Sequence, residues 1–227
     1  ISAVDLTADV YSSGFEPLFK GKLSKNKNLL TISKLAESLM HNFIGGRIDA
    51  SEVFDARQWA DYIVLSEIWG ATHGLSWSNL RFYFNPITLK FEPVAWDSRP
   101  DCNWYSYFRP DVTFNKKRMD ADDSDNFIYM ILNSPTMRTA LKDAAVSFEQ
   151  ELSTAGFFNK YASQDRALRQ LLAVMPLWQR YFPDPISFVA IVEKAKLVAR
   201  IVASDLFDDA PPPPKEFLDA VPEFLIG

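Results

Sequence analysis

Two polar side chains flank a predicted β-hairpin, and their types suit a divalent cation. Asn79 precedes the first apolar run of the hairpin, Asp97 directly follows the second run, and Asn-Pro-Ile-Thr at 85–88 separates the two runs. Asn-Pro is typical of a turn. A tight hairpin returns the chain to its starting point, so we expect the two side chains to be neighbours. A carboxylate and an amide oxygen that converge on one point suit Mg²⁺, which binds a few protein oxygens together with phosphates and waters.

The order loop, Asn, strand, turn, strand, Asp also occurs in protein kinases. There the catalytic loop ends in a metal-binding Asn, and a metal-binding Asp follows a short hairpin. Metals held by both residues neutralise charge on the nucleotide phosphates. An Asn before a strand and an Asp after one are also ordinary turn and capping residues. The spacing alone therefore leaves a structural interpretation open beside the metal site.

Helices are predicted on both sides of this hairpin. Apolar residues at helical spacing predict a helix over 29–43, which Gly45 and Gly46 end, and a second helix between Asp55 and Gly70. The second helix is apolar on most sides, which is typical of a central helix. Further helices are predicted over 125–133, 136–152, 163–175 and 185–206.

The predicted fold is mainly α with a small β-hairpin at 80–96, an α+β class. Residues 1–28 are expected to be an N-terminal extension or the remnant of a preceding lobe, and 29–208 a helical lobe that contains the hairpin. Residues 209–227 form a Pro-rich linker and a C-terminal tail. An isolated hairpin is only marginally stable in water, so helices must cover it.

Composition excludes several classes of function. With 24 basic and 29 acidic residues the net charge is -5, which provides no electrostatic footprint for nucleic acid. No apolar run approaches the roughly 20 residues that span a bilayer, so no transmembrane segment is predicted. The single cysteine, Cys102, excludes an internal disulfide and leaves the compartment undetermined.

The segment 55–97 resembles the CotH-like kinase family, the relatives of the spore-coat protein kinase CotH. The similar pieces are the helix DARQWADY at 55–62, the turn GATH at 70–73, the strand NLRFYFNP at 79–86 and the strand EPVAWD at 92–97. The resemblance extends diffusely over about residues 29–175. It implies an atypical protein-kinase-like fold, of which this chain is similar to the C-terminal lobe. It also implies that Asn79 and Asp97 are the metal-binding Asn and Asp, with Mg²⁺ and ATP as cofactors.

Two positions near this site depart from the pattern. Kinases place the catalytic Asp five residues before the metal-binding Asn, where this chain has Gly74. His73 is then the candidate catalytic base, since an imidazole can accept a proton near neutral pH; the alternative is a hydrogen bond within the loop. Family members often carry an Asp two residues after the metal-binding Asp, where this chain has Arg99. Arg99 either contacts phosphate or pairs with Asp97.

The nucleotide-binding half of a kinase is missing from the pattern. Kinases hold ATP with a Gly-rich loop and a strand Lys, and the only candidate stretch, Tyr11–Lys22, is too short for such a lobe. We expect that lobe to lie upstream in a longer chain or to have been lost.

Two functions remain open. The first is ATP- and Mg²⁺-dependent phosphoryl transfer to a protein substrate, provided that the upstream lobe exists. The alternative is a catalytically degenerate kinase-like module, a pseudokinase, with a structural or interaction role in a larger assembly. Both imply a protein partner. The resemblance alone suggests a cell-envelope or secreted location, because family members are often coat or envelope proteins.

Overall fold

The chain is described here from a computed structural model, which covers residues 17, 20–23, 25–76, 79–98, 126–154, 156–160, 164, 166–167, 170 and 188–204. This part is mainly helical and carries one two-stranded antiparallel sheet, which confirms the predicted α+β class. The elements are α2 (Lys20–Leu23), α3 (Lys27–Ile44), α4 (Ala50–Val53), α5 (Ala56–Trp69), η1 (Thr72–Leu75), β1 (Phe82–Asn85), β2 (Lys90–Pro93), α7 (Asn126–Leu132), α8 (Pro135–Ser153), η3 (Phe158–Lys160) and α11 (Phe188–Ala203).

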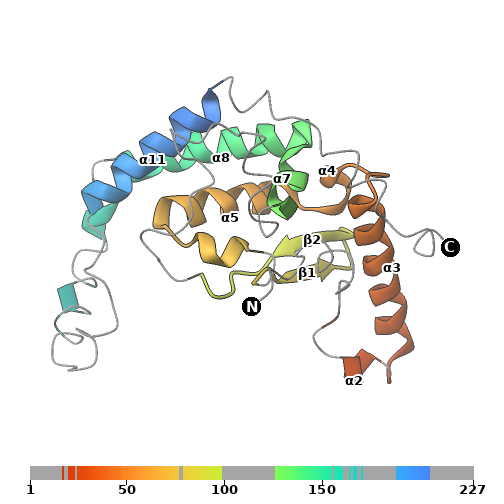
Figure 1. Cartoon of the computed structure of the whole chain (residues 1–227). Coiled ribbons are helices and arrows are strands. Elements are labelled where there is room, and N and C mark those ends of the chain that lie inside the picture. The colour runs from red at the N-terminus through yellow and green to blue at the C-terminus, as the bar shows by residue number, and fades with distance from the viewer. Residues whose placement is uncertain are drawn as a thin grey trace, which may run out of the picture.

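Helix α5 lies at the centre of the described part. It contacts α8 and α11 on one side and β2 and η1 on the other, so it separates the paired outer helices from the hairpin (Figure 1). Its buried residues lie on several faces, and the fully buried Trp59 and Ile63 are among them. A helix that is buried on several sides needs neighbours on each of them. The predicted central position of this helix is therefore confirmed.

The predicted helix boundaries follow from local capping chemistry. The Asp55 carboxylate accepts a hydrogen bond from Gln58 N at 2.9 Å and begins α5, while Gly70 ends the helix in the left-handed conformation with φ 67. Ser134 caps α8 in the same way as Asp55 caps α5, and Pro135 occupies the first turn.

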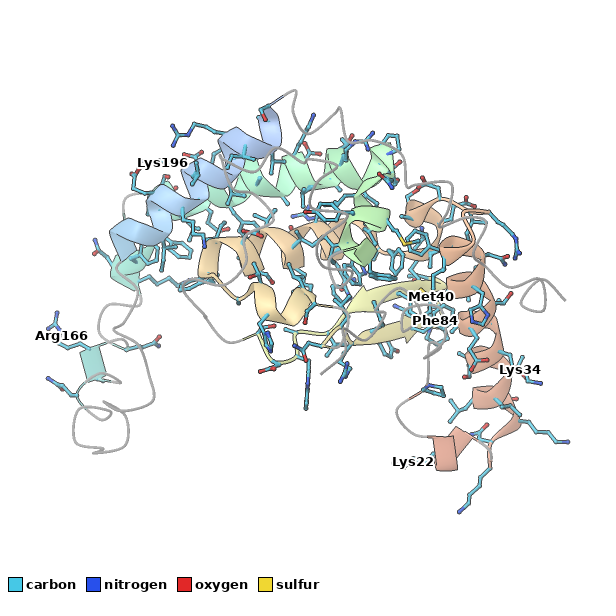
Figure 2. The ribbon with its side chains drawn as sticks, viewed as in Figure 1. Lys22, Lys34, Met40, Phe84, Arg166 and Lys196 are labelled. Carbon is cyan, nitrogen blue, oxygen red and sulfur yellow. The ribbon has the colours of Figure 1, made fainter. Side chains whose placement is uncertain are left out.

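The apolar residues of α3 are buried to different extents. Leu30 and Leu35 are each 40% exposed, while Ala36, Met40 and Phe43 are buried. Contact with the remainder of the fold decides which part of the helix is covered. In Figure 2 Lys34 points outward from α3, whereas Met40 points into the interior.

The hairpin is held against α5 by a buried hydrogen bond. The Trp59 indole N–H donates to the Phe91 carbonyl oxygen at 3.0 Å, and the Asp55 amide donates to the same oxygen at 3.1 Å. The rings of Phe54, Phe82 and Phe127 pack around this point in edge-on or tilted contacts. The strands pair from Phe82↔Pro93 to Asn85↔Lys90, so they are shorter than the predicted 80–96.

A second junction joins three elements at Asp49. Its carboxylate accepts hydrogen bonds from Ser51 N at 2.8 Å, Ser51 Oγ at 2.6 Å and Ser134 Oγ at 2.6 Å, and the Lys90 ammonium donates to the Ser51 carbonyl. Burial alone would raise the pKa of Asp49. The hydrogen bonds from Ser134 and Ser51, with the Lys90 charge, outweigh it, so the pKa lies below its ordinary value.

Large apolar side chains are exposed on the hairpin. Tyr83 is 53% exposed, Ile87 90% and Trp96 57%. No helix among those that the structure describes is long and apolar enough to cross a membrane. Residues 1–16 of the predicted N-terminal extension at 1–28, and the predicted linker and tail at 209–227, lie outside the described residues.

We expect Trp59→Phe to lower the free energy of unfolding by about 2 kcal/mol or more, because it removes both a buried hydrogen bond and buried ring volume. Trp69→Phe on the same helix is the matched control. Trp69 is 36% exposed, so its substitution should cost less than about 1 kcal/mol. Urea unfolding measures both variants, and equal losses would contradict the assigned role of Trp59.

We expect Asp49→Ala to cost about 2 kcal/mol at neutral pH, against about 1 kcal/mol for Asp55→Ala, since Asp55 caps one helix while Asp49 also binds Ser134. The lowered pKa of Asp49 stabilises the fold above the ordinary carboxyl pKa, and that contribution is lost as the pH falls through the folded-state pKa. Asp49 is exposed, so solvent screening keeps this pH-dependent part below about 1 kcal/mol. Unfolding at pH 7 and below pH 4 measures the difference in stability between the wild type and Asp49→Ala. This difference should be smaller in acid.

Candidate functional site

The candidate site forms where the end of α5, η1 and the residues after β2 meet. The left-handed Gly70 turns the chain out of α5, and the Ala71 amide donates to the Ser66 carbonyl at 2.7 Å. Helix η1 then packs against α5, and the chain enters the hairpin (Figure 1). Because the antiparallel strands bring residue 94 back to residue 81, the segment after β2 returns to the loop that carries η1.

Asn79 and Asp97 meet at one nitrogen of His73. Asn79 Nδ2 lies 2.9 Å from His73 Nε2, and Asp97 Oδ2 lies 3.1 Å from the same atom. The His73 and Asp97 side chains are 40% and 43% exposed, so water reaches both. The hairpin therefore brings together the two side chains at its ends, with the His73 imidazole between them.

The Asn79 amide nitrogen lies within hydrogen-bond distance of three atoms. Its two hydrogens can be donated to two of them, from among His73 Nε2 at 2.9 Å, the His73 carbonyl oxygen at 3.1 Å and Ser76 Oγ at 3.1 Å. Ser76 Oγ in turn donates to the His73 carbonyl at 2.8 Å. His73 Nε2 can either accept from Asn79 or, when it carries a proton, donate to Asp97, but it cannot do both. In both states Asn79 stabilises the turn after η1.

Asp97 has an uncommon backbone conformation. Its φ is 48, in the left-handed region, where Asp and Asn are tolerated better than other residues with side chains. This conformation directs the chain after β2 toward η1, where Ser98 Oγ lies 3.3 Å from the Tyr62 hydroxyl. An Asp at position 97 thus both tolerates the left-handed backbone conformation and provides the carboxylate that contacts His73.

Gly74 is enclosed on the side where a side chain would project. A Cβ at Gly74 would lie 2.6 Å from Ser98 Oγ, 2.8 Å from the Tyr62 hydroxyl oxygen and 3.0 Å from the Trp96 carbonyl oxygen. The Trp96 contact involves backbone, so it cannot be relieved by a change of rotamer. The position where the kinase pattern places a catalytic Asp therefore has no room for a carboxylate.

Tyr62 joins α5 to both parts of the site. Its hydroxyl donates to the Gly74 carbonyl at 3.2 Å and also contacts Ser98 Oγ. Burial raises the pKa of Tyr62, and the hydrogen bond from Ser98 lowers it by less, so the phenol stays protonated at neutral pH. The phenol is thus a fixed donor that holds η1 against the residues after β2.

The site as arranged does not fit a Mg²⁺ ion held by two protein oxygens. Asp97 offers an oxygen, but Asn79 turns its amide nitrogen toward the cluster, and an imidazole nitrogen lies between them. Mg²⁺ prefers oxygen ligands in octahedral geometry. Among the described residues, no three His, Cys, Asp or Glu side chains group as metal ligands.

The structure describes three of the four predicted site residues. His73, Asn79 and Asp97 are brought together, and Arg99 lies outside the described residues. The sequence analysis missed Tyr62, Ser76 and Ser98. The hydrogen bond between Asn79 and Ser76 could have been predicted, because Ser and Asn three residues apart in a turn often bond to each other or to the turn backbone. The contacts of Tyr62 carry no local signal, because its partner Ser98 lies 36 residues away.

No protein-family model, curated protein or solved structure compared with this chain matches it. The kinase-like interpretation of residues 55–97 therefore depends on the residues quoted above.

We expect Gly74→Ala to lower the free energy of unfolding by about 1–3 kcal/mol, because the new methyl group overlaps Ser98, Tyr62 and the Trp96 carbonyl. Gly21→Ala is the control, since a Cβ there meets no atom within 4 Å. Thermal unfolding with a matched denaturant series measures both variants. A Gly74→Ala variant with unchanged stability would show that a methyl group fits at this position.

Proposed function

We propose that this chain is a catalytically degenerate kinase-like module with a structural or interaction role in a larger assembly. The enclosed Gly74 carries this proposal. In a kinase, the catalytic Asp at this position accepts the proton of the substrate hydroxyl. Here Ser98, Tyr62 and the Trp96 carbonyl occupy the space that such a side chain would need. The packing of the loop around Gly74 thus leaves no space for a carboxylate side chain at this position.

The hydrogen bonding of Asn79 supports the same proposal. Its amide nitrogen serves the His73 carbonyl and Ser76 Oγ. Presenting its oxygen to Mg²⁺ would require a half-turn of the amide and the loss of both hydrogen bonds, at about 1 kcal/mol each. In a working metal site the ligands are oriented in advance. Asn79 is instead oriented to support the turn.

The exposed apolar side chains of the hairpin favour an interaction role. Tyr83, Ile87 and Trp96 are all more than half exposed. Large exposed apolar side chains are more typical of interaction surfaces when several of them occur on one hairpin.

Phosphoryl transfer is the second candidate, and the contact between His73 and Asp97 favours it. A carboxylate that holds one ring nitrogen fixes the tautomer and leaves the opposite nitrogen, Nδ1, to accept a proton. His73 Nδ1 makes no hydrogen bond to any residue that the structure describes. In this alternative an upstream lobe would have to supply the nucleotide site.

Incubation of the full-length protein with millimolar ATP and Mg²⁺ separates the two candidates. For a degenerate module we expect no transfer of the γ-phosphate to protein and no Mg²⁺-dependent rise in melting temperature. Asp97→Asn is the matched variant, because Asn tolerates the φ of 48 at this position while Ala would add backbone strain.

A rise in melting temperature that needs both Mg²⁺ and ATP, and that disappears in Asp97→Asn, would overturn the proposal in favour of a nucleotide-binding protein. Phosphoryl transfer that is lost in His73→Gln would further assign the base to His73.

A further inference from the structure

We propose that α2 and the first half of α3 bind the surface of an anionic lipid membrane. We call this part of the molecule, residues 20–23 and 25–35, the basic tip. Its lysines contact the anionic headgroups, and its exposed leucines enter the boundary between headgroups and acyl chains. This proposal goes beyond the degenerate module and does not require nucleotide binding.

The basic tip has the opposite charge to the rest of the chain. It contains five lysines and no acidic residue. The whole chain has 24 basic and 29 acidic residues, so 19 basic and 29 acidic residues remain outside the tip, with a net charge of -10. The total charge of -5 conceals this separation. An anionic surface therefore attracts the tip and repels the remainder of the chain, which orients the molecule.

Three lysines of the basic tip lack an acidic partner within the described part of the chain. Lys25, Lys27 and Lys34 are exposed, and none of them forms an ion pair with a described residue. Lys27 and Lys34 are seven residues apart, so they lie on the same side of α3. In Figure 2 Lys34 points outward from this helix. These ammonium groups are thus available to an anionic partner.

The lysines at the start of α3 do not stabilise the helix. Asn26 caps α3, Lys27 is its first residue, and no acidic residue lies in its first turn. Because the start of a helix carries partial positive charge, acidic side chains are favourable there and lysines are not. A residue that departs from a local stability rule without compensation inside the fold is often functional. The helix start and the lysines instead combine into one positive field.

Apolar side chains lie among these lysines. Three leucines of the tip are at least 40% exposed, namely Leu29, Leu30 and Leu35. All residues from 25 to 31 are exposed, and Figure 1 shows this end of α3, with α2 beside it, projecting beyond the hairpin. Leu30 lies one turn from both Lys27 and Lys34. Leucines interspersed with lysines are typical of helices that lie at a membrane surface.

The residue types of the tip favour a lipid surface over a folded protein partner. The tip contains no arginine and no aromatic residue. Protein interfaces are enriched in both and depleted in lysine. Lysine binds phosphate as a point charge on a flexible stem, so it does not need a partner of fixed geometry. Lipid headgroups can rearrange around a projecting tip, whereas a folded partner would need a complementary pocket.

Sedimentation of the full-length protein with lipid vesicles tests the proposal. We expect binding to vesicles of equal parts phosphatidylserine and phosphatidylcholine, and no binding to vesicles of phosphatidylcholine alone. Binding should weaken as the salt concentration rises. Replacing Lys25, Lys27 and Lys34 together with Gln should weaken binding about a hundredfold, since each lysine near an anionic surface contributes about fivefold.

The matched control replaces Lys194, Lys196 and Arg200 of α11 with Gln. It changes the net charge by the same amount, and in Figure 2 Lys196 lies on the opposite side of the molecule from Lys34. We expect this control to bind the anionic vesicles as the wild type does. Melting temperatures measured without lipid establish that both variants are folded.

Replacing Leu30 and Leu35 together with Ala tests the apolar contact. We expect binding to the anionic vesicles to weaken about tenfold or more, because each truncation removes apolar surface that the membrane would bury. Val146→Ala on α8 is the control, since Val146 is 43% exposed and lies outside the basic tip. Its binding should equal that of the wild type.

Absence of vesicle binding, equal binding to both kinds of vesicle, or equal losses in the lysine variants of α3 and α11 would each overturn the proposal. Binding to soluble poly-glutamate without binding to vesicles would overturn it in favour of an acidic protein partner. Unchanged binding in the leucine variant would overturn the apolar contact. None of these outcomes changes the result of the experiment with Mg²⁺ and ATP, so failure of this proposal and failure of the proposed function are distinguishable.

Discussion

The position of the hairpin on α5 depends on one buried carbonyl. The Phe91 oxygen accepts hydrogen bonds from the Trp59 indole and the Asp55 amide, and aromatic rings exclude water around it. A buried carbonyl without partners would cost the desolvation of a polar group, so the strand and the start of α5 have to remain together. This constraint places the hairpin beside α5, from whose end η1 leaves, and so brings the residues after β2 toward the loop that carries η1.

The site shows a competition between two uses of the same polar groups. Asn79 can support the turn after η1 or turn an oxygen toward a cation, but it cannot do both at once. Asp97 can accept a proton from His73 or bind a metal. In the arrangement that the structure shows, both side chains serve the protein itself.

Local sequence patterns predicted the elements well where their causes are local. Asp55 and Gly70 bound α5 as expected, and Ser134 with Pro135 begins α8, because caps and left-handed turns depend on neighbouring residues. The same reasoning says less about the packing of α3. Of its apolar residues at helical spacing, Phe43 is buried, while Leu30 and Leu35 are each 40% exposed. Periodicity identifies a helix, but it does not say which side the remainder of the fold will cover.

The candidate site likewise has features that follow from local sequence and features that depend on tertiary packing. The sequence by itself determined that a hairpin closes between Asn79 and Asp97, because an Asn-Pro turn and two aromatic runs require the chain to return. Only the tertiary structure decided that His73 lies between them, that the Asn79 amide turns its nitrogen inward, and that Gly74 is enclosed by Ser98 and Tyr62. These features arise where segments far apart in the chain pack together. Tyr62 and Ser98, for example, are 36 residues apart, so no local spacing encodes their contact.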